Sequence, residues 1–149
     1  MNMSSAEYEK IYTVFDFYDG IRTGIADFNG AHHYYERPSD EAQGDWADYF
    51  LLKPIDEETF QLAMEDWAIW QRWYAASLAR ETTVDTHPAL PEDRARHDEI
   101  QAILKRRLVV NPATDIKAQG EIQRNYEGVW PKHATNPFAR LQIKWRVVA

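Results

Sequence analysis

The chain has 149 residues, a formal net charge of −7, 44% hydrophobic residues and no cysteine. This length and composition are typical of one folded domain, so we expect a single globular domain over residues 1–149. The lack of cysteine excludes disulfides, thiolate metal sites and a cysteine nucleophile. The polar start of the chain has no signal-peptide pattern and no stretch is apolar enough for a transmembrane helix, which predicts a cytoplasmic protein.

Two dipeptides, Asp19-Gly20 and Asn29-Gly30, interrupt a segment rich in β-branched and aromatic residues. Asp-Gly and Asn-Gly accept the positive φ that a type I′ turn needs at both central positions. They predict a three-stranded antiparallel meander, which is followed by a polar loop and a fourth strand. The expected strands are Lys10–Tyr18, Ile21–Phe28, Ala31–Arg37 and, after the loop Pro38–Asp45, Ala47–Lys53.

Two-residue turns fix which side chains are neighbours across the meander. We assign to the core the face whose rows are Ile11-Phe28-Ala31, Thr13-Ala26-His33 and Phe15-Gly24-Tyr35. The opposite face has the rows Tyr12-Asp27-His32, Val14-Ile25-Tyr34 and Asp16-Thr23-Glu36. Opposed side chains lie roughly 4.5–5.5 Å apart at Cβ, so this second face is expected to be an acidic and aromatic surface.

That polar meander face is the candidate site. A carboxylate beside His32 would orient the imidazole for general-base catalysis. Two further acids flank the central strand about 9–10 Å apart at the backbone, a spacing compatible with an inverting acid–base pair. The candidate catalytic residues are Asp27, His32, Asp16 and Glu36, with Tyr12, Thr23 and Tyr34 as ligand-binding neighbours. The alternative interpretation is a face that is polar only because water covers it.

A long helix is predicted from the N-cap Asp56 to about Arg80. It is apolar on two sides. The broader stripe, expected to cover the sheet, contains Phe60, Ala63, Met64, Trp67, Tyr74 and Leu78. The second stripe contains Leu62, Ile69, Trp73 and Ala76. Either another part of the chain packs over this second stripe, or it is the interface of a homodimer or of another protein partner centred on Trp73.

A second helix is predicted from Pro91 to about Leu108, and its charged face is expected to be solvated. His87 and His97 are interpreted as surface groups beside and on this helix. Alternating residues then predict a strand over Ile116–Ile122 and a last strand over Arg140–Val147. The fold class is therefore α+β: an antiparallel sheet, made of the three-stranded meander, a fourth strand and a C-terminal strand pair, packed against two helices.

The last third of the chain is basic although the whole chain is acidic. The cations gather on the C-terminal strands and are Lys117, Arg124, Arg140, Lys144 and Arg146, with Tyr126 and Trp130 nearby. Such a surface is compatible with single-stranded nucleic acid, but the net charge opposes it and cross-strand ion pairs are a simpler account.

Motifs of known chemistry are missing. There is no phosphate loop, dinucleotide fingerprint or nucleophile elbow. Adjacent strand residues such as His32 and His33 point to opposite faces, so no metal site or cofactor is indicated. The leading hypothesis is a small binding or interaction protein that pairs with itself or another protein through Leu62, Ile69 and Trp73. The alternative is an enzyme or small-ligand site on the polar meander face, and a weaker one is nucleic-acid binding; no membrane partner is expected.

Overall fold

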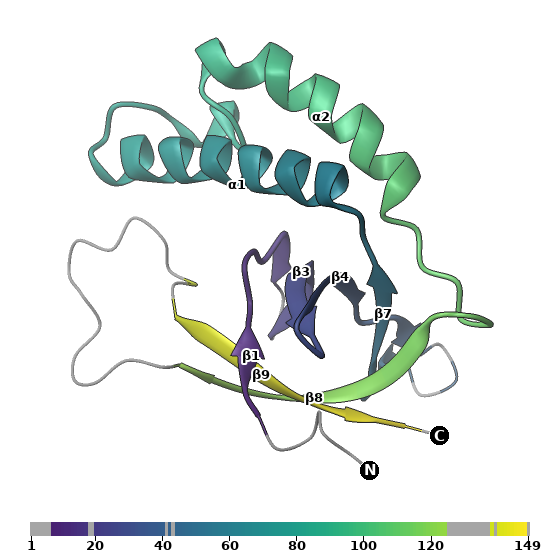
Figure 1. Cartoon of the computed structure of the whole chain (residues 1–149). Helices are drawn as coiled ribbons and strands as arrows, with labels where there is room; N and C mark the ends of the chain where they lie inside the picture. Colours follow the sequence, from purple (N-terminus) through teal and green to yellow (C-terminus); the bar gives the residue numbers. More distant parts are fainter. Residues whose placement is uncertain are drawn as a thin grey trace.

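A computed structural model describes residues 7–17, 20–40, 42, 44–124, 138 and 140–148. Within these residues the chain is an α+β fold in which a curled antiparallel sheet lies beneath two helices (Figure 1). The strand order of this sheet is β1-β9-β8-β7-β4-β3-β2, and β5 pairs with β6 separately. The strands are β1 (Glu9–Lys10), β2 (Asp16–Phe17), β3 (Ile21–Phe28), β4 (Ala31–Glu36), β5 (Ser39–Asp40), β6 (Asp45–Trp46), β7 (Phe50–Pro54), β8 (Ile116–Arg124) and β9 (Leu141–Val147).

The helices are α1 (Glu57–Leu78) and α2 (Arg94–Arg107), with short 3₁₀ turns at η2 (Val84–Thr86) and η3 (Pro91–Asp93) between them. α1 begins where the sequence predicts, because the Asp56 carboxylate accepts a hydrogen bond of 2.8 Å from the backbone N–H of Thr59. α1 runs across the curled sheet and α2 lies on the outer side of α1 (Figure 1). Among the described helices, none combines the length and apolarity needed to cross a bilayer.

The second hairpin of the meander has the expected register. Asn29 and Gly30 adopt φ values of 53° and 76°, as a type I′ turn requires. β3 and β4 therefore pair with Asp27 opposite His32, Ile25 opposite Tyr34, and Thr23 opposite Glu36. The turn residues alone were sufficient to place these side chains as neighbours.

The first strand departs from the expected register. Asp16 lies opposite Thr23 as predicted, but Ile11 pairs with Ala26 instead of Phe28. The cause is a bulge, because the N–H groups of two successive residues, Tyr12 and Thr13, both donate to the carbonyl oxygen of Ile25. The residues of the first turn that precede Gly20, at positions 18 and 19, lie outside the described residues.

This N-terminal segment also joins the two ends of the sheet. Its start, β1, pairs with β9, and the Ile11 N–H donates to the carbonyl oxygen of Leu141 at 3.2 Å. Its end, β2, pairs with β3. The sheet therefore curls around an apolar interior in which Tyr35 and Trp145 are fully buried.

The second stripe of α1 is covered by the chain itself. Ile69 is 1% exposed and Trp73 is 7% exposed, and the half-buried Leu62 packs against the same cluster as Ile100 and Leu104 of α2. The prediction of an interface at Leu62, Ile69 and Trp73 is therefore wrong, and the interpretation in which the second helix packs over this stripe holds. Because α2 is amphipathic, its apolar face is stable only when buried, and it packs on the second stripe of α1.

The expectation that the polar meander face is open to solvent is also wrong. Ile25 is fully buried and Tyr34 is 6% exposed, in one cluster with Ala63 of α1 and Leu104 of α2. The middle row of that face is apolar, so the helices cover it, while the acidic rows remain at its margins. Both faces of the meander are thus packed.

Candidate functional site

The first candidate group, Tyr12, Asp27 and His32, is brought together. His32 Nδ1 lies 2.9 Å from Asp27 Oδ1, and the Tyr12 hydroxyl donates to Asp27 Oδ2 at 3.0 Å. The ring of His32 stacks on Phe60 of α1 with 3.7 Å between centroids. Burial, with the hydrogen bond and charge of Asp27, raises the pKa of Tyr12 to about 12, so its hydroxyl stays protonated. This group connects the meander to the start of α1 and lines no described cavity.

The second candidate group, Asp16, Thr23 and Glu36, shares one row of the sheet as predicted. The Tyr34 hydroxyl donates to Glu36 Oε1 at 2.9 Å. Burial is the main cause that raises the pKa of Tyr34 far above its usual range, and the charge of Glu36 adds to it. Glu36 therefore acts here as the hydrogen-bond acceptor of a buried tyrosine.

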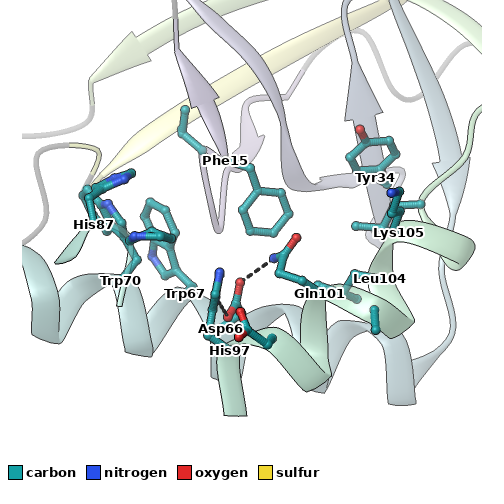
Figure 2. Close-up of a pocket in the computed structure, with 15 residues that line it drawn as sticks. Phe15, Tyr34, Asp66, Trp67, Trp70, His87, His97, Gln101, Leu104 and Lys105 are labelled. Carbon is teal, nitrogen blue, oxygen red and sulfur yellow. Dashed lines mark hydrogen bonds and ion pairs between the residues drawn. The ribbon is translucent and has the colours of Figure 1, made fainter. Parts of the chain in front are cut away.

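A cavity of about 800 Å³ lies between the meander, α1 and α2 (Figure 2). We call it the helix–sheet cavity. Its apolar lining consists of Val14, Phe15, Tyr34, Trp67, Trp70, Pro88, Ala102, Leu104 and Leu108. Of the site residues predicted from the sequence, only Tyr34 lines it. Its volume is within the range of small-molecule sites in proteins, which is about 300–1,000 Å³.

Aromatic rings form one wall of the cavity. Trp67 and Trp70 of α1 stack with 4.7 Å between centroids and an angle of 16° between their planes. Phe15 meets Trp67 edge-on, with 6.5 Å between centroids, and points toward the middle of the cavity (Figure 2). An aromatic wall of this kind favours an apolar ligand with an aromatic body.

A polar cluster lies beside this wall, where α1 meets α2 (Figure 2). Asp66 of α1 is 7% exposed, and its carboxylate accepts a hydrogen bond of 2.7 Å from the side-chain amide of Gln101. His97 Nδ1 lies 2.7 Å from the other carboxylate oxygen of Asp66. Asp66, His97 and Gln101 all line the cavity. One carboxylate thus holds two side chains of the second helix.

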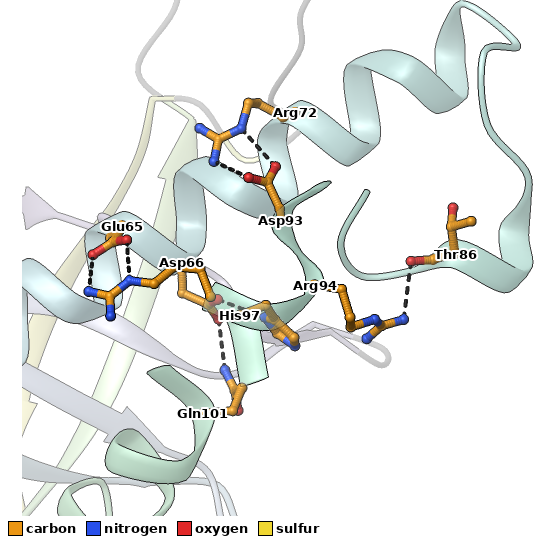
Figure 3. A network of polar contacts seen from close by, with 9 residues as sticks. Glu65, Asp66, Arg72, Thr86, Asp93, Arg94, His97 and Gln101 are labelled. Carbon is orange, nitrogen blue, oxygen red and sulfur yellow. Dashed lines mark hydrogen bonds and ion pairs between the residues drawn. The ribbon is translucent and has the colours of Figure 1, made fainter. Parts of the chain in front are cut away.

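Further polar contacts fasten the two helices beside this cluster (Figure 3). Arg96 donates two hydrogen bonds to Glu65 at 2.6 and 2.7 Å, and Arg72 donates two to Asp93 at 2.9 and 3.0 Å. These pairs are bidentate, which fixes the orientation of α2 as well as its distance from α1. The cavity is therefore bounded by helices whose relative position is set by polar contacts.

His87 and Lys105 complete the polar lining. The ring of His87 meets Trp73 edge-on with 4.6 Å between centroids. Burial lowers the pKa of His87, and the charges of His97 and Arg94 lower it further. Among the residues that the structure describes, no carboxylate pairs with Lys105.

The interpretation of His97 as a surface group missed this site, because its side chain is 13% exposed, whereas His87 is exposed as expected and also lines the cavity. The sequence did hold a signal. Asp66 shares one side of α1 with the apolar residues Ala63 and Trp70, three positions before it and four after it, where a buried charge needs partners. His97 and Gln101 are four residues apart on the polar side of α2, so they share one face of that helix.

The described cations of the C-terminal strands have neighbours across the sheet. Lys144 Nζ lies 3.9 Å from Glu121 and 4.9 Å from the ring centre of Tyr8. Lys117 lies over the ring of Tyr49 at 4.3 Å, and Arg146 donates to Gln119. The side chain at position 124, and the aromatic residues at positions 126 and 130, lie outside the described part of the chain.

Among the described residues, no three of His, Cys, Asp or Glu are grouped so that they could hold a metal ion. Comparisons of the chain with protein-family models, with curated proteins and with solved structures give no match. The geometry of the cavity is therefore the basis for a functional proposal.

Proposed function

We propose that the protein binds a small, flat and mainly apolar molecule in the helix–sheet cavity. The observation that carries this proposal is a cavity of about 800 Å³ whose lining contains stacked tryptophans and a buried, hydrogen-bonded carboxylate. An apolar lining with a few converging polar groups is the usual composition of a ligand site.

The energetics support a ligand with an aromatic body. Phe15 is 36% exposed and Trp70 is half-buried, so a ligand in the cavity would remove apolar area of these two rings from water. Each Å² removed contributes about 25 cal/mol of gross stabilisation, against which the ligand loses translational freedom. The polar cluster then selects among apolar molecules by the groups they carry.

The proposal replaces the two locations that the sequence indicated. The second stripe of α1 and the middle row of the polar meander face are both covered, while the acidic rows lie partly exposed at the margins of that face. The same elements nevertheless border the cavity, since Tyr34 comes from the meander and Trp67 from α1.

The test uses 8-anilinonaphthalene-1-sulfonate, a planar fluorophore whose emission rises in apolar surroundings. We expect saturable binding of one molecule per chain. Ala102 is exposed on α2 and lines the cavity, whereas Ala95 is exposed on the same helix and does not line it. Ala102→Phe should narrow the cavity and weaken binding about tenfold, which corresponds to about 1.4 kcal/mol.

Ala95→Phe is the matched control and should bind the fluorophore like the unmodified protein. Both substitutions are at exposed helix positions, so circular dichroism should show the same helix content. Non-saturable emission, or equal affinity in the two variants, would show that the fluorophore does not occupy the cavity and would refute the proposal.

A further inference from the structure

Asp66 is an unusual residue for its position. It is followed by Trp67 on a helix that is apolar on two sides, and it is 7% exposed. A buried carboxylate is costly unless hydrogen bonds or charges compensate for the lost water. Here both carboxylate oxygens are engaged, one with His97 and the other with Gln101.

This arrangement determines the state of the His97 ring. An ionised carboxylate can only accept, so the His97 Nδ1 that contacts Asp66 carries the hydrogen. In the neutral ring the lone pair is then on Nε2. Among the described residues no group forms a hydrogen bond with Nε2, and His97 lines the cavity. The lone pair is therefore available to a molecule bound there.

An imidazole that is held by a carboxylate and lines a ligand cavity can act as a proton acceptor. We infer that His97, positioned by Asp66, takes a proton from the ligand, so that the cavity selects aromatic molecules with an acidic hydroxyl group. The inference rests on the proposed function, because it names the class of ligand that the helix–sheet cavity takes.

The proton transfer is balanced within the site. The O–H bond of the ligand breaks and its electron pair stays on the ligand oxygen. The proton forms the N–H bond at Nε2 of His97, which becomes an imidazolium. Asp66 stays ionised and offsets the new positive charge at 2.7 Å, so the pair and the ligand together hold one negative charge.

The groups around His97 favour this direction of transfer. Asp66 contacts its ring from α1, His87 lies near it on the segment between the helices, and Asp98 and Lys105 of α2 line the same cavity. Burial and the nearby positive groups lower the pKa of His87, so it adds no charge at neutral pH that would oppose the imidazolium.

The test uses 4-nitrophenol, whose phenolate absorbs at a longer wavelength than the phenol. Titrations are done at a pH where the dissolved compound is mostly protonated. Quenching of tryptophan fluorescence reports binding beside Trp67 and Trp70, and the phenolate band reports proton transfer. We expect both signals from the unmodified protein, and quenching alone from 4-nitroanisole, which lacks the hydroxyl.

His97→Gln should bind 4-nitrophenol without the phenolate band. Glutamine keeps a donor for Asp66, so the helix contact and the fold are retained. His32→Gln is the matched control, because His32 also contacts a carboxylate, that of Asp27 at 2.9 Å, but does not line the cavity, and it should keep the band.

The outcomes separate the inference from the proposed function. Saturable quenching without a phenolate band, or a band that persists in His97→Gln, would overturn the inference and leave the cavity as an apolar binding site. Binding of the naphthalene fluorophore but not of 4-nitrophenol would also overturn the inference alone. If none of these probes binds in the cavity, both fail.

Discussion

The Asp66–His97 contact should contribute measurably to stability as well as to the site. The perturbations are Asp66→Asn, His97→Gln and the double variant. Each hydrogen bond to a charged group contributes about 1.5–3 kcal/mol, and Asp66 accepts from two side chains. Asparagine keeps the shape and one acceptor, so about 2–3 kcal/mol of unfolding free energy should be lost in Asp66→Asn. The coupling energy of the double-variant cycle should be about 1–2 kcal/mol.

Urea unfolding followed by tryptophan fluorescence measures these values. With a denaturant slope of about 1–3 kcal/mol per molar urea, the midpoint should fall by about 1 M in Asp66→Asn. The neighbouring pair Glu65–Arg96 joins the same two helices at 2.6 Å, but both side chains are 43% exposed. Its coupling should be much smaller because water screens the charges. Equal coupling in the two pairs would refute the reasoning, since burial would then make no difference.

Three further predictions concern packing and pH. Gly24→Ala should prevent folding, as judged by circular dichroism, because its Cβ would clash with the backbone carbonyl oxygen of Thr13. Gly120→Ala should fold with some loss of stability, because the Ile143 side chain must move and the Trp145 ring must shift slightly, but no backbone atom is in the way. Ile69→Ala should cost about 2–5 kcal/mol without changing the elution volume in size-exclusion chromatography, because the residue is covered by α2 and not by a second chain. The pKa of His87 is lowered in the folded protein. The free energy of unfolding should therefore be constant at pH values above 6.5, the ordinary pKa of histidine, and should fall as the pH drops below 6.5. Denaturant titrations at several pH values should show that His87→Gln flattens this fall.

The sequence was sufficient where a short segment determines its own geometry. The Asn29-Gly30 turn fixed the pairing of Asp27 with His32 because strand neighbours follow from the turn by counting. The N-cap Asp56 fixed the start of α1 by a contact that spans three residues. Both predictions depend on the backbone conformation and hydrogen bonds of a few neighbouring residues, which distant residues do not change.

Predictions failed where the answer depends on contacts between distant segments. The bulge at Tyr12 and Thr13 has no marker in the sequence, because neither residue is a glycine or a proline. The two apolar stripes of α1 were visible, but only the position of α2 decides whether the second stripe is a partner surface. The Asp66–His97 contact joins residues 31 positions apart, and the residues next to either one do not predict which partner it contacts.

The polar cluster is better explained by a function than by packing. Apolar side chains of similar volume at a buried charged contact often give equal or greater stability, so Asp66 and His97 are not needed to hold α2 on α1. The bidentate pairs Glu65–Arg96 and Arg72–Asp93 already orient α2 at little desolvation cost, since their arginines are exposed. What the buried pair adds is a fixed imidazole in the lining of a cavity walled by tryptophan. Burying a carboxylate is costly, and here the buried carboxylate lies in the lining of the cavity. This is the arrangement expected of a site that recognises a polar group on an apolar ligand.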